Sequence, residues 1–215
     1  MSTIPTYGDK RRTRVGLLGG SFNPAHSGHL HIAQEALRFL RLNQVWLMVS
    51  PGNPLKSKKN MAPFFQRLES AEKIADGKRI VATDIEYRLR QRFTVKTIAE
   101  LIRRFPNVEF VWLMGADGLA NFTRWKHWRK IVRLIPIAVF PRPENVIPAL
   151  HSAAASALKK YYRPSREAYI LARQKPPAWT FLVSPQMKIS STQIREAGGF
   201  CFEGSERKRI PPPRR

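Results

Sequence analysis

Residues 14–30 read RVGLLGGSFNPAHSGHL, and this stretch decides the fold. Its first five residues form a short apolar segment that predicts a buried strand, ended by Gly19 and Gly20. A helix is predicted after the loop, because four apolar residues recur at helical spacing: Leu30, Ala33, Leu37 and Leu40. A strand, a loop and a helix in this order are typical of the first unit of an α/β protein.

The same alternation continues along the chain. Further strands are predicted at 45–49, 80–83, 108–114, 137–140 and 181–183, and further helices at 64–75 and 94–104. Strands that alternate with helices need right-handed crossovers and form a parallel sheet covered on both faces. The predicted fold class is therefore a single-domain α/β fold with a doubly wound, Rossmann-like parallel sheet. In such sheets ligands bind beyond the carboxyl ends of the strands.

Composition bounds the class of protein. A chain of 215 residues is long enough for one domain with a substantial core, and we place that domain at residues 14–197. The sequence has no apolar run of the length that a bilayer requires, so we expect no membrane association. Residues 1–13 are expected to form a flexible extension, and residues 198–215, which are basic and rich in proline, a disordered tail.

Two further features predict a cytoplasmic location. The start of the chain, MSTIPTYGDKRRTR, lacks the apolar core and cleavage pattern of a secretory signal. Cys201 is the only cysteine, which excludes an intramolecular disulfide and a four-cysteine zinc site and suits a reducing compartment.

The chain is strongly basic. Lys and Arg number 38 against 15 Asp and Glu, a formal net charge of +23 that favours anionic partners. The charge alone does not identify the anion. A nucleic-acid-binding protein is one alternative, with Trp112, Trp125 and Trp128 as candidate stacking residues. No segment resembles a standard nucleic-acid-binding module, so nucleic acid is the less favoured partner.

The loop at residues 19–29 predicts an anion-binding site. Its glycines let the backbone approach a ligand closely, and the free amides of the helix that starts near Gly28 point back at the loop. His26 and His29 are three residues apart, so they share one face of this helix end. With a pKa of about 6.5, either imidazole can offer phosphate oxygens a hydrogen bond or a positive charge. His31 does not share that face, and we expect it to be structural.

Residues 189–195, ISSTQIR, predict a second anion site. Ser190 or Ser191 can cap a new helix, and Thr192 adds a hydroxyl beside its exposed amides. Arg195 follows Ser191 by four residues, so its guanidinium returns to the same face, where it can hold a phosphate. Taken alone, the segment reads equally well as a plain helix cap and a surface arginine. Together with the first loop, it supplies a site for the far end of a triphosphate.

These two segments also carry a family resemblance. GGSFNPAHSGHL paired with ISSTQIR resembles the paired motifs of the HxGH nucleotidyltransferases, which bind a nucleotide triphosphate between them on a dinucleotide-binding-like fold. More narrowly, residues 14–196 are similar to the bacterial nicotinate mononucleotide adenylyltransferases, with further likeness in SPGNPLK, RFTVKT, FVWLMGAD and NFTRWKHW. The residues after Glu196 do not match the helical stretch with which that family often continues.

The resemblance implies a reaction and its partners. AMP would pass from ATP to nicotinate mononucleotide, giving nicotinate adenine dinucleotide and pyrophosphate in NAD biosynthesis. Mg²⁺ would be delivered with ATP, because the sequence shows no dense carboxylate cluster for a metal site of its own. The resemblance leaves room for a homo-oligomer. Two relatives in the same chemistry, phosphopantetheine adenylyltransferases and glycerol phosphate cytidylyltransferases, stay as alternatives, although Trp125, Asn53 and the chain length favour the pyridine nucleotide.

The resemblance also implies residue roles. His26 and His29 would bind the phosphates during transfer, while Lys56 and Arg195 would hold the β and γ phosphates. The remaining ATP-binding residues would be Gly19, Gly20, Ser21, Phe22, Ser190, Ser191 and Thr192. The acceptor-binding residues would be Asp117 on a ribose, Trp125 stacked on the pyridine ring, and Asn53 and Thr94 nearby. Two of these residues have structural alternatives: a helix N-cap for Asp117, and for Trp125 a core position in helical register with Trp128 and Val132.

Overall fold

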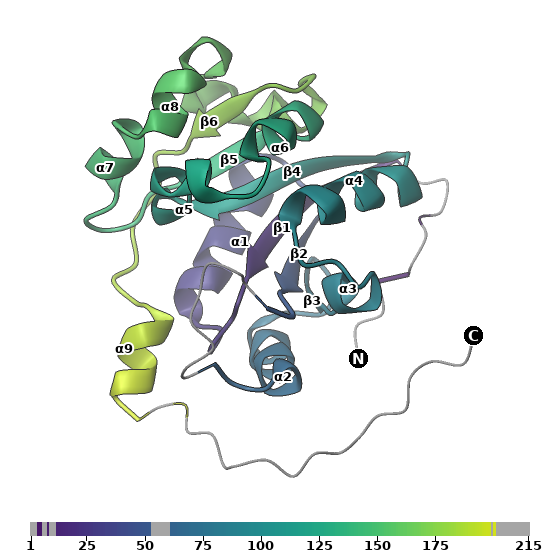
Figure 1. The fold of residues 1–215 in the computed structure, drawn as a ribbon, viewed down its shortest axis with the longest axis vertical. Helices are drawn as coiled ribbons and strands as arrows, with labels where there is room; N and C mark the ends of the chain where they lie inside the picture. The colour runs from purple at the N-terminus through teal and green to yellow at the C-terminus, as the bar shows by residue number, and fades with distance from the viewer. Residues whose placement is uncertain (1–3, 6–7, 9–11, 53–60, 199, 201–215) are drawn as a thin grey trace.

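The protein is built around one parallel sheet (Figure 1). The computed structural model describes residues 4–5, 8, 12–52, 61–198 and 200. In this part of the chain six strands lie in the order β3-β2-β1-β4-β5-β6, and every neighbouring pair is parallel. They are β1 (Thr13–Gly20), β2 (Gln44–Val49), β3 (Ile80–Thr83), β4 (Val108–Gly115), β5 (Ile137–Phe140) and β6 (Trp179–Phe181).

Helices cover both faces of the sheet. The helices are α1 (Ser27–Phe39), α2 (Phe64–Ile74), α3 (Ile85–Arg88), α4 (Thr94–Arg104), α5 (Ala116–Ala120), α6 (Trp128–Leu134), α7 (Val146–Leu150), α8 (Ala153–Ala157) and α9 (Ser191–Glu196), with 3₁₀ turns η1 (Phe122–Arg124), η2 (Lys159–Tyr161) and η3 (Ser165–Arg173). One apolar core joins the sheet to α1, α2 and η3, and a second joins it to α3, α4, α5 and α6. The predicted doubly wound α/β fold is confirmed.

The strand order indicates where along the sheet a ligand would bind. From β1 the chain winds outward to β3, then returns past β1 to β4 and winds the other way to β6. The winding therefore reverses between β1 and β4, whose register pairs Leu18 with Leu113. Crevices at such a reversal, beyond the carboxyl ends of the strands, are where doubly wound sheets bind ligands. Here those ends are Gly20 and Gly115.

The last strand lies two residues earlier than predicted. Trp179 is buried, and its indole N–H donates to the carbonyl of Leu158 at 2.9 Å. Val183, which the prediction placed in the strand, is 80% exposed. The apolar run that continues past Phe181 hid this boundary, because hydrophobicity alone does not separate a strand from the exposed residues after it.

Two described residues near the start of the chain contact the domain. Ile4 is buried in the core, and its carbonyl accepts a hydrogen bond from the Arg88 guanidinium at 2.8 Å. The N–H of Gly8 donates to the carbonyl of Arg104 at 3.0 Å. The flexible extension at residues 1–13 stays a prediction, because most of these residues lie outside the described part of the chain. Most of the predicted tail lies outside the described residues. No helix in the described part of the chain is long and apolar enough to cross a membrane.

Candidate active site

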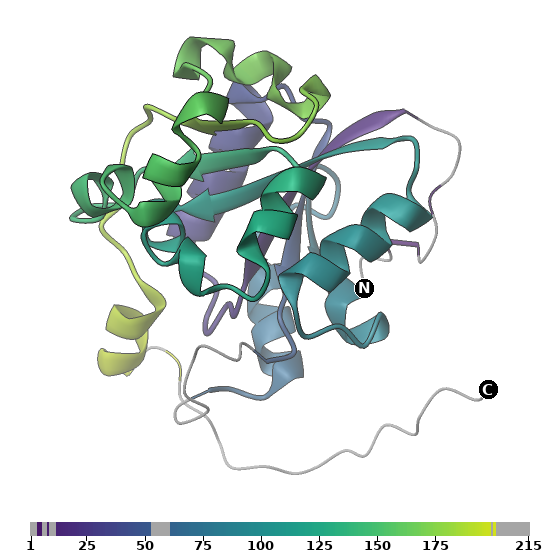
Figure 2. The same ribbon diagram turned by 45° about the horizontal axis from the view of Figure 1, so that its top comes forward.

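A cavity of about 900 Å³ lies at the reversal point of the sheet. Its wall comes from the ends of β1 and β4, the start of α1, the residues before α4, the segment from η1 to α6, and α9. In Figure 2 these segments converge beyond the tips of the central strands. The volume is at the upper end of the range for small-molecule sites, about 300–1,000 Å³, and suits two ligands side by side.

The predicted site residues meet at this cavity. Every predicted site residue that the structure describes lines it: Gly19, Gly20, Ser21, Phe22, His26, His29, Thr94, Asp117, Trp125, Ser190, Ser191, Thr192 and Arg195. Asn53 and Lys56 lie outside the described residues. The fold therefore brings together segments from opposite ends of the chain, although it does not by itself assign their roles.

Two histidines form the start of α1. His26 is the N-cap, and its Nδ1 accepts a hydrogen bond from the N–H of Gly28 at 3.1 Å. The N–H of His26 in turn donates to Nδ1 of His29 at 3.2 Å, which completes a capping box. The ring centroids lie 3.9 Å apart. Because each Nδ1 accepts a backbone hydrogen bond, each ring carries its hydrogen on Nε2. The capping box thus orients two Nε2–H donors.

His26 is a neutral donor. Its side chain is buried, and burial together with the positive charge of Arg142 lowers its pKa from 6.5 to about 4. At pH 7 the ring therefore carries no charge. Of the two predicted contributions, a hydrogen bond or a positive charge, the lowered pKa favours the hydrogen bond for His26, because the position of the ring at the helix start removes it from water.

The segment with α9 docks onto the β1–α1 loop. Ser190 is the N-cap of α9, since its hydroxyl accepts from the N–H of Gln193 at 3.2 Å. Ser191 points the other way, and its hydroxyl donates to the carbonyl of Pro24 at 2.9 Å. The choice left open by the sequence is thereby decided: Ser190 caps the helix and Ser191 ties it to the first loop.

Arg195 strengthens this junction. Its Nη1 donates to the carbonyls of Asn23 and Ser191, and its Nη2 donates to the Thr192 hydroxyl at 3.2 Å. A plain surface arginine would make no such set of bonds. His31 adds a further link, because its Nε2 lies 2.9 Å from the carbonyl of Pro185, as expected for a structural residue.

Trp125 lies in the wall of the cavity opposite this loop. It follows η1 and precedes α6, so it does not belong to the helix that holds Trp128 and Val132. Its half-buried ring meets Trp112 edge-on, with centroids 6.0 Å apart, and Phe122 with centroids 5.4 Å apart. One side of the ring therefore packs on the core, while the residue also lines the cavity. A ring held in this way is a suitable stacking surface.

Asp117 lies in the first turn of α5, where the N-cap is Gly115. The N-cap alternative for Asp117 is therefore wrong. Its half-exposed carboxylate lies 3.6 Å from Nε of Arg142. A Cβ at Gly115 would lie 2.4 Å from Oδ1 of Asp117, so this carboxylate position needs a glycine at the end of β4.

Arg142 and Arg67 are two residues that the sequence analysis missed. Arg142 follows β5, lines the cavity and lies close enough to lower the pKa of His26. Arg67 is 2% exposed, and its Nη1 donates at 2.7 Å to the carbonyls of both Ser21 and Ser50. Burial lowers the pKa of Arg67. This side chain therefore ties the loop after β1 to the end of β2.

The sequence held a signal for each of these arginines. Arg142 stands two residues after a predicted strand, the position where ligand-binding side chains gather. Arg67 lies three residues after Phe64 and four before Ala71, on the apolar face of a predicted helix.

Two of the three candidate stacking residues for nucleic acid are buried. Trp112 is 2% exposed and Trp128 is 8% exposed, so neither can stack on a base at the surface. Within the described ranges, no group of three or more His, Cys, Asp or Glu side chains could hold a metal ion.

A doubly wound sheet with two candidate anion-binding segments and an aromatic ring at its reversal point is typical of nucleotide-binding proteins. Residues 17–197 match the family model described as cytidylyltransferase-like. A "Probable nicotinate-nucleotide adenylyltransferase" from Gluconobacter oxydans is 66% identical over 187 residues, which cover 87% of this chain and 96% of that protein. Its counterpart from Gluconacetobacter diazotrophicus is 58% identical over 195 residues, 91% of each chain.

A solved structure has the same fold. It is Plasmodium falciparum nicotinic acid mononucleotide adenylyltransferase complexed with NaAD, with a TM-score of 0.64 at 18% identity, covering 86% of this chain and 83% of that one. At this identity the likeness concerns the fold alone. From the family model and the curated relatives together, the chain belongs to the cytidylyltransferase-like family and, within it, to the nicotinate-nucleotide adenylyltransferases. The resemblance inferred from the two sequence motifs is confirmed.

Proposed function

We propose that the protein transfers the AMP part of ATP to nicotinate mononucleotide, forming nicotinate adenine dinucleotide and pyrophosphate. The observation that carries this proposal is a single cavity that joins both anion-binding loops to an aromatic wall at the reversal point of the sheet. The names and high identity of the relatives support it.

The phosphate side of the cavity acts by positioning and charge stabilisation. His26 and His29 direct Nε2–H groups at the phosphates. Lys56 and Arg195 bind the β and γ phosphates, assisted by Ser191 and Thr192 at the start of α9. The backbone from Gly19 to Phe22 contacts the nucleotide. Preorganised donors of this kind stabilise negative charge that grows in the transition state without having to reorient.

The chemical step needs no covalent enzyme intermediate. An oxygen of the acceptor phosphate attacks the α phosphorus of ATP in line, forming the new P–O bond. The bond from the α phosphorus to the oxygen shared with the β phosphorus breaks, and its electron pair leaves with pyrophosphate. The attacking phosphate is already ionised, so no general base is required. A divalent metal, Mg²⁺ in our proposal, arrives with ATP as part of the substrate and neutralises charge on the leaving group.

The opposite wall holds the acceptor. Trp125 stacks on the pyridine ring, and Asp117 accepts hydrogen bonds from ribose hydroxyls. Thr94, at the start of α4, and Asn53 bind near the ring substituent. We assign this catalytic unit to residues 14–197 and place the reaction in the cytoplasm, which suits a chain with one cysteine.

The test is an assay of pyrophosphate release with a panel of acceptors. Nicotinate and nicotinamide mononucleotides are each supplied with ATP, phosphopantetheine with ATP, and glycerol phosphate with CTP. A site that binds a carboxylate through hydrogen-bond donors leaves some of those donors facing the NH₂ group of the amide, where they have no acceptor. We therefore expect kcat/KM to be at least about a hundredfold higher for nicotinate than for nicotinamide mononucleotide, a difference of roughly 2.7 kcal/mol. Similar values for acid and amide would end the specificity claim. Turnover with phosphopantetheine alone would overturn the proposed function.

A further inference from the structure

Two buried polar atoms in the cavity wall lack a partner. In the part of the chain that the structure describes, they are the only buried side-chain nitrogen or oxygen atoms without a hydrogen bond: Ser21 Oγ and Trp112 Nε1. Both residues line the same cavity. Buried polar groups in folded proteins are nearly always paired, so unpaired ones in a ligand cavity point to a ligand contact. Ser21 belongs to the proposed ATP loop, whereas Trp112 has no assigned role.

Packing fixes the indole of Trp112 on two sides. A Cβ at Gly19 would lie 2.6 Å from Cη2 and 3.1 Å from Cζ2 of the indole, so the ring edge rests on this glycine. The indole of Trp112 also meets the ring of Trp125 edge-on, with an interplanar angle of 85°. The benzo end of the indole therefore lies against the end of β1, and the ring is held in the wall of the cavity.

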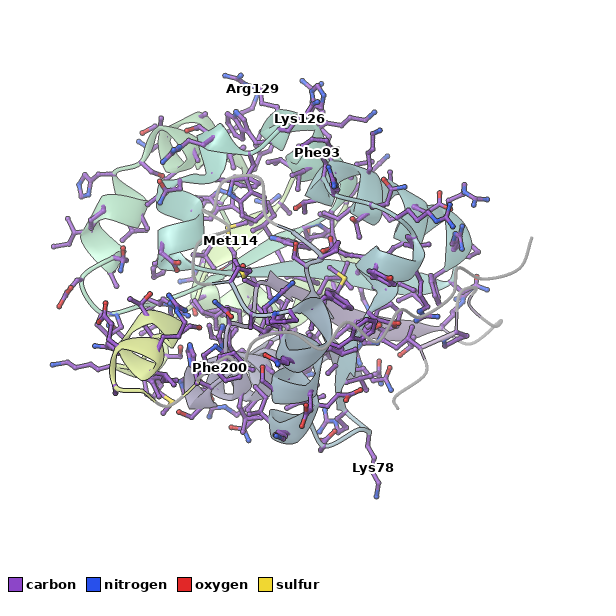
Figure 3. The ribbon with its side chains drawn as sticks, turned by 60° about the horizontal axis from the view of Figure 1, so that its bottom comes forward. Lys78, Phe93, Met114, Lys126, Arg129 and Phe200 are labelled. Carbon is purple, nitrogen blue, oxygen red and sulfur yellow. The ribbon has the colours of Figure 1, made fainter. Side chains whose placement is uncertain are left out.

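Trp112 belongs to the acceptor half of the site. It lies in the apolar core shared with α4 and α6, against which Phe93 and Trp125 also pack. Phe22 of the ATP loop belongs to the core on the opposite face of the sheet. Lys126 Nζ lies 4.4 Å from the centroid of the Phe93 ring, and both residues line the cavity (Figure 3). Trp112 and Phe22 thus belong to the cores on opposite faces of the sheet, although the indole edge touches Gly19.

We propose that the indole N–H of Trp112 donates a hydrogen bond to an oxygen of the acceptor's nucleoside half, either a ribose hydroxyl or the carboxylate of the ring. An indole N–H can only donate, so its partner must be an acceptor atom of the ligand. This inference rests on the proposed function. It makes Trp112 a specificity-determining residue for the acceptor and assigns it no contact with ATP.

The test compares Trp112→Phe with Trp46→Phe. Phenylalanine keeps an aromatic ring in the core and removes the donor. Trp46 is a matched control, because it is buried in the same core and its Nε1 already donates to Gln44 at 3.2 Å. We expect Trp112→Phe to raise KM for nicotinate mononucleotide by about five- to tenfold, with KM for ATP changed by less than about twofold. Trp46→Phe should leave both KM values near those of the wild type.

The amide substrate locates the partner atom. If the indole contacts the ring carboxylate, Trp112→Phe also lowers the preference for acid over amide; if it contacts the ribose, KM rises equally for both. Either pattern supports the proposal. An unchanged KM for the acceptor, or an equal rise in KM for ATP, overturns it.

A measurement on the wild-type protein covers the case in which Trp112→Phe fails to fold. With ¹⁵N-labelled indole groups, the Trp112 N–H resonance should move on addition of nicotinate mononucleotide and stay in place on addition of ATP. A resonance that does not respond to the acceptor contradicts the inference. Failure of the proposed function would look different, because the wild type itself would then show no turnover with nicotinate mononucleotide.

Discussion

The two halves of the cavity are built in different ways. On the ATP side, the paired histidines and Gly28 lie within four consecutive positions and hold one another through backbone hydrogen bonds. On the acceptor side, Thr94, Asp117 and Trp125 come from three separate segments and are placed by the packing of short helices on the sheet. Local hydrogen bonds leave a motif in the sequence, whereas packing of distant segments does not.

Each half holds one buried titratable side chain. On the phosphate side the buried histidine is neutral, and Arg142 lies near both this histidine and Asp117. Beneath the acceptor side lies Glu86, 7% exposed, whose carboxylate accepts a hydrogen bond from the Thr97 hydroxyl at 2.9 Å. Burial raises its pKa to about 7, and the Thr97 bond opposes that rise only in part. Burial thus disfavours the charged form of a side chain in each half: the protonated form of His26 in one and the ionised form of Glu86 in the other.

The largest effect is expected from His29→Ala on the ATP side. Loss of one preorganised donor should lower kcat by about two to three orders of magnitude while the protein stays folded. Nδ1 of His29 also accepts a hydrogen bond from the N–H of His26. His29→Asn serves as the control, because the shorter asparagine side chain can still accept this bond. Turnover of both variants at saturating substrate gives the answer. Near wild-type turnover of the alanine variant would contradict the role assigned to His29.

The next effect concerns stability on the acceptor side. The pKa of Glu86 rises from 4.5 to about 7, so between these pH values the folded protein holds a proton that the unfolded chain has lost. The free energy of unfolding of the wild type should therefore fall, relative to that of Glu86→Gln, as the pH rises through this window, by about 3 kcal/mol in all. Glu86→Gln cannot ionise and still offers Thr97 an acceptor, so it should lack this loss.

Urea unfolding of both proteins at pH 4.5, 6 and 8 measures this difference. Groups shared by the two proteins, His26 among them, cancel in the comparison. Stability curves that run parallel across the range would show that Glu86 keeps an ordinary pKa.

The contrast explains what the sequence could predict. Helical spacing, the glycine pair at Gly19 and Gly20, and the histidine pair are local patterns, and they were enough to predict the doubly wound sheet and the ATP-side loop. The role of Arg67 depends on carbonyls 17 and 46 residues away in the chain, which no local pattern records. The sequence showed Trp112 within an apolar run and as a candidate stacking residue for nucleic acid, but not as a donor in the cavity, because its unpaired N–H is visible only once the strands are side by side.

A smaller effect should follow from Trp125→Ala, which removes the aromatic wall of the acceptor side. Stacking on a base is worth roughly 1–3 kcal/mol, so we expect KM for the mononucleotide to rise by about thirtyfold. KM for ATP should change far less, because Trp125 packs with Trp112 and Phe122 in the core on one face of the sheet, whereas Phe22 of the ATP loop packs in the core on the other. Initial rates with each substrate varied in turn separate the two constants. An equal rise in both would show that the halves are not independent.

The smallest effect is expected from Arg195→Lys, which tests whether the ATP side depends on geometry as well as charge. Lysine keeps the positive charge and loses the planar fork that bonds Asn23, Ser191 and Thr192. We expect kcat/KM for ATP to fall by about tenfold, with a smaller change for the acceptor.

The matched control is Arg38→Lys on the exposed surface of α1, where the arginine pairs with Glu35 and lies over the ring of Phe39. It makes the same chemical change outside the cavity and should leave both constants unaltered. If Arg195→Lys lowers kcat/KM equally for ATP and the mononucleotide, its main role is to hold α9 on the β1–α1 loop, since loosening that junction would disturb the whole cavity. A loss confined to ATP instead places the guanidinium on the leaving phosphates.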